Sequence, residues 1–138
     1  MKVAFHKGGQ RMGDKLIKWW DAGPYSHCEV VFDDGLWASA SLMDGAKVRG
    51  KRINPTPGSW DYLDLPGSEL AARNFFARTE GTGYDLLGLA RFVIAPCRGA
   101  GDRYWCSEWV AEALGLKEPW RYGPNGLHNV LCALREAP

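Results

Sequence analysis

The fold of this chain is organised around one stretch, Arg103-Tyr104-Trp105-Cys106-Ser107-Glu108-Trp109-Val110-Ala111-Glu112-Ala113-Leu114-Gly115. Val110, Ala113 and Leu114 recur at helical spacing, and Gly115 is placed to end a helix. Glu108 would fall in the first turn, where the helix dipole favours negative charge. The pattern therefore predicts that Cys106 lies at, or just before, a helix N-terminus.

A cysteine in that position has chemical consequences. A helix N-terminus presents unpaired N–H groups and partial positive charge, which stabilise a thiolate and can hold an oxyanion. A nucleophile of this kind needs a base, and the persuasive candidate, His27, lies far earlier in the chain. A lone cysteine at a helix start is more often a small buried residue. The inference therefore depends on the two residues together.

Composition limits the classes of protein to be considered. A chain of 138 residues is about one domain, spanning 1–138, and its net charge of +1 creates no field that would favour nucleic acid or a membrane. It has no run of about 18 apolar residues, so we expect no transmembrane helix. Residues 1–6 lack the apolar run of an export signal, which predicts a cytoplasmic protein with reduced thiols, or a phage-encoded protein released by other means.

The cysteine spacing does not suggest a metal site. Cys28, Cys97, Cys106 and Cys132 form no Cys-x-x-Cys pair and no close cluster with histidine. We therefore expect no metal and no other cofactor, and a zinc-binding structural protein is kept only as an alternative.

Strand patterns gather in the first half of the chain and helical patterns in the second. Alternation and turn residues predict strands at 3–6, 25–32, 36–41, 47–52 and 59–65. Helices are expected from Asp14, from 67–69, over 84–90, from Cys106, and in a short last helix that follows a turn at 124–126. Residues 96–102 are expected to form a loop. This segregation argues for an α+β fold in which a mostly antiparallel β-sheet packs against helices.

The segment around His27 alternates in polarity. His27 and Glu29 share one face of the predicted strand, and Cys28, Val30 and Phe32 share the apolar face. We therefore expect His27 to face the sheet surface or the edge of the sheet.

The register of the following hairpin decides which residues face His27. A three-residue loop at 33–35, with Gly35 in the left-handed conformation, places Glu29 opposite Ser39 and His27 opposite Ser41. A two-residue loop at 34–35 would reverse this parity. Three groups could therefore hold the imidazole ring: Ser39, Ser41 or Glu29.

Two short motifs resemble a known family. Tyr25-Ser26-His27 at the start of a strand, then a hairpin and a distant Tyr104-Trp105-Cys106-Ser107-Glu108 at the start of a helix, resemble the permuted NlpC/P60 papain-like superfamily. This group includes YiiX/YaeF-like proteins and relatives of lecithin:retinol acyltransferase. Ordinary papain-like enzymes have the cysteine helix before the histidine strand, whereas the permuted group has the reverse order, as here. The resemblance extends from about Val3 to Leu116 and implies a circularly permuted papain-like fold.

The resemblance also implies catalytic roles. Cys106 would be the nucleophile and His27 its base. The third, polar residue of the family lies on the strand after the histidine strand, and an ungapped comparison places Ser39 there. Family members often carry His or Glu at that position, so Ser39 would be a weaker orienter, or the role would pass to Glu29.

Further residues would line the substrate cleft if the resemblance holds. Tyr84-Asp85 resembles a recurring Tyr-Asp element of the family, and Tyr104 and Ser26 flank the two catalytic motifs. We expect all four residues to contribute to substrate binding.

The implied activity is that of a papain-like cysteine hydrolase, a peptidase or amidase that cleaves an amide bond, such as one in a cell-wall peptide. Its partner would be a peptide, amide or acyl substrate. One alternative is a lipid acyltransferase or thioesterase of the same superfamily. Another is an inactive relative that binds a peptide or a cell-wall fragment. The sequence indicates neither the substrate nor an oligomeric state.

Overall fold

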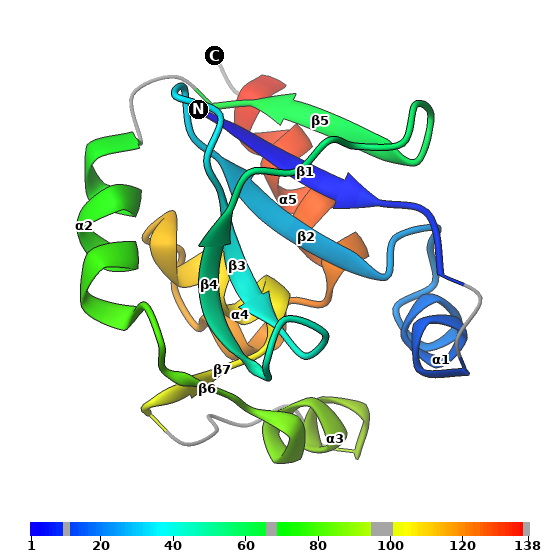
Figure 1. Cartoon of the computed structure of the whole chain (residues 1–138). Coiled ribbons are helices and arrows are strands. Elements are labelled where there is room, and N and C mark those ends of the chain that lie inside the picture. The colour runs from blue at the N-terminus through cyan, green and yellow to red at the C-terminus, as the bar shows by residue number, and fades with distance from the viewer. Residues whose placement is uncertain (10–11, 66–68, 95–100, 137–138) are drawn as a thin grey trace.

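The computed structural model describes residues 1–9, 12–65, 69–94 and 101–136 and has an α+β architecture (Figure 1). The elements in chain order are β1 (Lys2–His6), α1 (Met12–Trp20), β2 (His27–Val31), β3 (Trp37–Ser41), β4 (Lys47–Lys51), β5 (Trp60–Asp64), α2 (Glu69–Thr79), β6 (Gly83–Tyr84), α3 (Leu86–Ile94), β7 (Arg103–Tyr104), α4 (Cys106–Ala113), the 3₁₀ helix η1 (Pro119–Arg121) and α5 (Pro124–Glu136). The expected α+β class is confirmed.

The strands form one mixed sheet in the order β5-β1-β2-β3-β4-β6-β7. Every neighbouring pair is antiparallel except β6 and β7, which are parallel. In the β2–β3 hairpin Val30 pairs with Ala38, and Gly35 has φ of +81°. These are the register and the left-handed glycine of the three-residue loop, so Glu29 lies opposite Ser39.

One face of the sheet packs against helices. Its side chains include Val3, Phe5, Cys28 and Val30, which are all fully buried. Helix α4 lies against β2 and β3 and also contacts α2 and α5 (Figure 1). Seven of its eight residues are buried, so α4 is the central helix of the molecule.

The ends of α4 follow from its sequence. The helix begins at Cys106, as predicted, and Trp105 precedes it in an extended conformation. At the other end Gly115 has φ of +72°, and its N–H bonds to the carbonyl of Glu112 while that of Leu116 reaches Ala111. This is the Schellman arrangement, which favours glycine because a side chain would be strained at that φ.

Several expected elements differ from those observed. The first helix, expected from Asp14, begins at Met12, and Arg103–Tyr104 form the short strand β7, which was not expected. Tyr84 lies in strand β6, where its N–H bonds to the carbonyl of Ala46, and not in a helix; the following helix begins at Leu86. The segment 124–126, expected as a turn, is the first turn of α5, with Pro124 in a position where a missing N–H costs nothing. Most of the expected loop at 96–102 lies outside the described residues. The expected start of a helix at 67–68 lies wholly outside them.

Asn125 in that first turn ties α5 to the segment before β2. Its side-chain Oδ1 accepts from the N–H of Tyr25 at 2.9 Å, and its Nδ2 donates to the Tyr25 carbonyl at 2.9 Å. Nδ2 also donates to Asp21 at 3.1 Å. A Cβ atom on Gly23 would overlap the Asn125 amide, so the close approach requires glycine there. The backbone entering β2 is thereby fixed two residues before His27.

Across the described ranges, none of the helices has both the length and the apolar character needed to cross a membrane.

Asn125→Ala should destabilise the fold because it leaves the buried N–H and carbonyl of Tyr25 without partners. We expect the free energy of unfolding to fall by about 2 kcal/mol, seen in urea denaturation as a lower midpoint with an unchanged slope. The exposed residue Asn54 provides the control Asn54→Ala. Equal midpoints for the two variants would contradict the role assigned to Asn125.

Candidate active site

His27, the first residue of β2, is held by a buried carboxylate on the same strand. Its Nε2 lies 3.0 Å from Oε1 of Glu29, two residues further along. The Glu29 side chain is 2% exposed, while that of His27 is 24% exposed. Strand alternation places the two side chains on the same face, and the imidazole is the more accessible group.

Glu29 is buried together with a matching cation. Arg49 of β4 donates from Nη1 to Oε2 at 2.7 Å and from Nη2 to Oε1 at 2.8 Å. Burial opposes ionisation of Glu29, but the hydrogen bonds from Arg49 and His27 and their charges outweigh it and lower its pKa to about 2. The residue is therefore a carboxylate near neutral pH.

The imidazole of His27 interacts with Cys106 as well as with Glu29. Burial alone would lower the pKa of His27. The charge of the Cys106 thiolate and a hydrogen bond with it, followed by the hydrogen bond and charge of Glu29, raise that pKa to about 10. Because Nε2 faces Glu29, Nδ1 is the ring nitrogen left for the sulfur. Both neighbours therefore favour the protonated form of His27.

Cys106 is 4% exposed, and its surroundings favour the thiolate. A hydrogen bond from the thiol of Cys28 contributes most to this preference. The charge and hydrogen bond of His27 and the backbone N–H of Cys28 add to it, and together they overcome burial and hold the pKa of Cys106 well below its usual value. Burial and the neighbouring Cys106 sulfur raise the pKa of Cys28, so Cys28 stays a thiol and acts as the donor.

The two serines opposite this strand bond to other groups. The hydroxyl of Ser39 is fully buried and donates to the carbonyl of Cys28 at 2.8 Å, so it bonds to the backbone of β2 and not to the imidazole. The hydroxyl of Ser41 donates to Asp44 at 3.0 Å. Of the three groups considered for the third position, Glu29 makes the contact with the imidazole.

Two of the residues expected to line the cleft lie close to Cys106 or His27. Tyr84 lies near Cys106: burial and then the negative charge of the Cys106 sulfur raise its pKa well above the usual value. Ser26, which precedes His27, is buried, and its hydroxyl donates to the carbonyl of Gly8 at 2.9 Å. The Ser26 hydroxyl thus ties the start of β2 to the segment after β1.

Asp85 and Tyr104 support the neighbouring backbone. The N–H of Asp85 bonds to the carbonyl of Tyr104 at 3.0 Å. Asp85 Oδ1 accepts from the N–H of Gly88 at 2.7 Å and so caps α3. The Tyr104 ring packs edge-on against Phe75 with centroids 5.8 Å apart. These contacts fix the strand that leads into Cys106.

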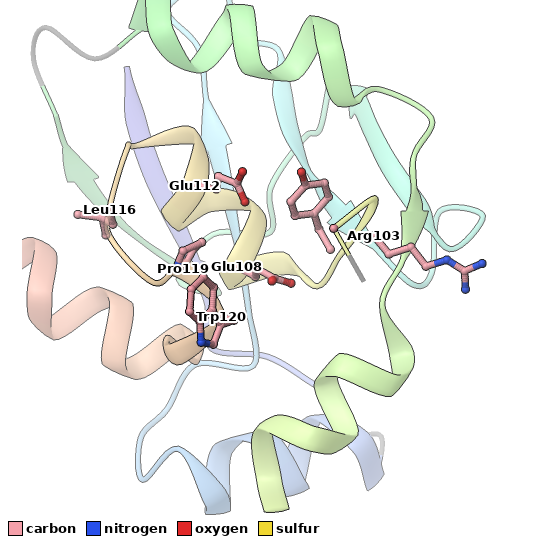
Figure 2. Close-up of a pocket in the computed structure, with 8 residues that line it drawn as sticks. Arg103, Glu108, Glu112, Leu116, Pro119 and Trp120 are labelled. Atoms are coloured by element: carbon pink, nitrogen blue, oxygen red, sulfur yellow. The ribbon is translucent and has the colours of Figure 1, made fainter. Parts of the chain in front are cut away.

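A separate pocket of about 230 Å³ lies beside α4 (Figure 2). Glu108 and Glu112, one turn apart, face it together with Pro119 and Trp120, and the guanidinium of Arg103 extends away from the two carboxylates (Figure 2). Neither Cys106 nor His27 lines this pocket, so it is distinct from the site formed by the two residues.

Sequence reasoning missed Arg49 and Cys28. A signal for Arg49 was present: residues 47–51 alternate, and the pairing of Ser39 with Arg49 brings this arginine to the face of Glu29. A buried glutamate also requires a nearby cation. Cys28 gave no comparable signal, because it follows the pattern of an ordinary core residue.

No three His, Cys, Asp or Glu side chains within the described ranges are grouped so that they could hold a metal ion. Comparison with models of known protein families and with curated protein sequences finds no match for this chain.

Glu29→Gln tests the ionised carboxylate. The pKa of Glu29 is lowered from 4.5 to about 2, so its contribution to stability is complete above pH 4.5 and is lost as the pH falls through about 2. We expect the variant to lose about 3 kcal/mol near neutral pH, with the difference from wild type disappearing across that acid range. Urea denaturation as a function of pH measures this difference.

The exposed Glu80 provides the control Glu80→Gln, which should follow the wild-type curve. A difference between Glu29→Gln and wild type that stays constant from neutral pH to below 2 would contradict a buried, ionised Glu29.

Proposed function

We propose that this chain is a cysteine hydrolase of the permuted NlpC/P60 papain-like type, and that it cleaves an amide bond in a peptide substrate. Cys106 is the nucleophile, His27 the general base and acid, and Glu29 the group that orients the imidazole. The observation that carries the proposal is the position of the His27 ring, which interacts with the Cys106 sulfur and bonds to Glu29 through Nε2 at 3.0 Å.

Several features support this assignment over that of an inactive relative. The inactive alternative was based on Ser39, which would orient the imidazole only weakly. Glu29 is a stronger hydrogen-bond acceptor for an imidazolium because it carries a full charge. The chain order of the histidine strand and the cysteine helix also agrees with the permuted group.

The first half of the reaction would form an acyl-enzyme. The thiolate of Cys106 attacks the substrate carbonyl carbon and forms a C–S bond, and the carbonyl electrons move to the oxygen. The backbone N–H of Cys106 at the helix N-terminus supports that oxyanion. The oxyanion then collapses and the C–N bond breaks. His27 gives its Nδ1 proton to the leaving amine as general acid.

The second half would release the acid. His27, now neutral, takes a proton from a water molecule, and the resulting hydroxide attacks the thioester carbon. The C–S bond breaks, the carboxylic acid leaves, and the thiolate–imidazolium pair is restored. Glu29 keeps its charge throughout and stabilises the imidazolium, as the third member of a triad does.

Cys106→Ala should abolish turnover while leaving the fold intact, because the replaced side chain is small and apolar packing is preserved. Wild type, Cys106→Ala and the control Cys132→Ala are compared by circular dichroism and by hydrolysis of peptidoglycan peptides and acyl esters. We expect loss of activity of at least about 10³-fold only in Cys106→Ala, and cleavage of peptides in preference to esters.

The outcomes distinguish the alternatives. Full activity in Cys106→Ala would overturn the nucleophile assignment. Preferential cleavage of acyl esters would replace the amidase with a lipid enzyme of the same superfamily. If wild type cleaves nothing and Cys106 alkylates only as fast as an ordinary thiol, the chain is an inactive relative.

A further inference from the structure

The candidate triad is connected to a buried chain of charges that ends at an exposed turn. Arg49 is 7% exposed and makes a two-pronged contact with Glu29 through Nη1 and Nη2. Its third nitrogen, Nε, donates to Oδ2 of Asp44 at 2.7 Å. Asp44 lies in the turn between β3 and β4. The guanidinium is therefore held between two carboxylates.

Asp44 is itself fixed by several donors. The hydroxyl of Ser41 donates to its Oδ2 at 3.0 Å, and Lys51 donates to Oδ1 at 2.7 Å. Burial opposes ionisation of Asp44, but these hydrogen bonds and the charge of Arg49 lower its pKa strongly. Asp44 is thus a charged anchor that orients the far side of the Arg49 guanidinium.

We propose that Arg49, held by Asp44, is a positioning residue for the proposed hydrolase and acts on His27 only through Glu29. It fixes both oxygens of the Glu29 carboxylate in the plane of its fork, which aims Oε1 at Nε2 of His27. It also keeps Glu29 charged in a buried position. None of the hydrogen bonds described above joins Arg49 to the Cys106 sulfur or to the imidazole.

The geometry of the contact argues for arginine rather than for any cation. A planar guanidinium with parallel N–H groups matches a carboxylate in two places, whereas an ammonium group offers only a point charge. The 2.7 Å and 2.8 Å contacts have the lengths expected of charge-assisted hydrogen bonds. The Glu29 carboxylate can therefore rotate only if its two hydrogen bonds with Arg49 break.

The charged groups around the site have to be considered together. His6 of β1 is paired with His27, and burial and the charge of His27 lower its pKa. Cys106 and Cys28 contact the site from α4 and β2. Asp21 also lies near it: burial raises the pKa of Asp21, and the charge of Cys106 adds to that rise. Of these groups and Arg49, the hydrogen bonds to Glu29 come from Arg49 and His27.

The test follows the alkylation of Cys106 by iodoacetamide as a function of pH, with the modified peptide quantified by mass spectrometry. In wild type the rate should stay high to well below the pH at which an ordinary thiol ionises. In Arg49→Gln the Glu29 carboxylate is no longer fixed, so Glu29 stabilises the imidazolium less and the pKa of His27 falls. A larger share of the pair is then neutral thiol and neutral imidazole, and the acidic limb of the thiolate moves upward by about one pH unit or more. Arg49→Lys keeps the charge but not the two-pronged contact, so its limb should return only part of the way to that of wild type.

The control is Arg52→Gln, which removes the same charge from an exposed residue close to Arg49 in sequence. Its profile should match that of wild type. Glu29→Gln and the double variant Glu29→Gln/Arg49→Gln complete a cycle. Their limbs should coincide, because Arg49 has no route to His27 once Glu29 is neutral.

A folded Arg49→Gln with the wild-type limb would overturn the inference. A double variant whose limb lies above that of Glu29→Gln would overturn it too, since Arg49 would then act by another route. If Arg49→Gln does not fold, the profile of Glu29→Gln is compared with that of the double variant. Coinciding limbs support the inference, and a difference between the limbs overturns it. A wild-type limb at the pH of an ordinary thiol would instead remove the proposed function itself.

Discussion

The ionised carboxylate of Glu29, buried in the sheet, is the constraint on which the rest of the site depends. A buried charge costs several kcal/mol unless it is paired and hydrogen-bonded. Here two cations provide that pairing: His27, which lies on β2 like Glu29 itself, and Arg49, which lies on β4. The need to pair this one carboxylate fixes the orientation of the imidazole and links β2 to β4.

The other half of the site is made by the helix. Because α4 begins at Cys106, the sulfur lies at the N-terminal end of the helix, where the helix dipole is positive. The packing of α4 against β2 brings Cys28 next to that sulfur, and the Cys28 thiol and N–H stabilise its negative charge. The site is therefore built on rigid elements, with one charged group contributed by the sheet and one by the helix.

The sequence predicts the parts of the fold that local patterns encode. Helical spacing ended by Gly115 located the start of α4 at Cys106, and the loop at 33–35 with a left-handed Gly35 set the β2–β3 register. Strands β6 and β7 were missed, because a two-residue strand has no period of its own and is defined only by its neighbours. Tyr84 was placed in a helix for the same reason.

Of the candidate site, short sequence motifs pointed to His27 and Cys106, but the residues that contact them were harder to predict. His27 and Cys106 stand in short motifs, whereas the third residue depends on which side chains meet across the sheet. Ser39 lies opposite Glu29 on the neighbouring strand, but its hydroxyl donates to the Cys28 carbonyl. Arg49 is recognisable only after Glu29 is known to be buried, which a half-polar strand does not reveal.

The proposed mechanism requires that Cys106 and His27 form a thiolate–imidazolium pair at neutral pH. The ultraviolet absorbance of the thiolate across a pH titration, taken as the difference between wild type and Cys106→Ser, measures this pair. We expect the difference to be at its full value already at neutral pH and to disappear only in acid. A difference that appears only as the pH rises through the range of an ordinary thiol would contradict it.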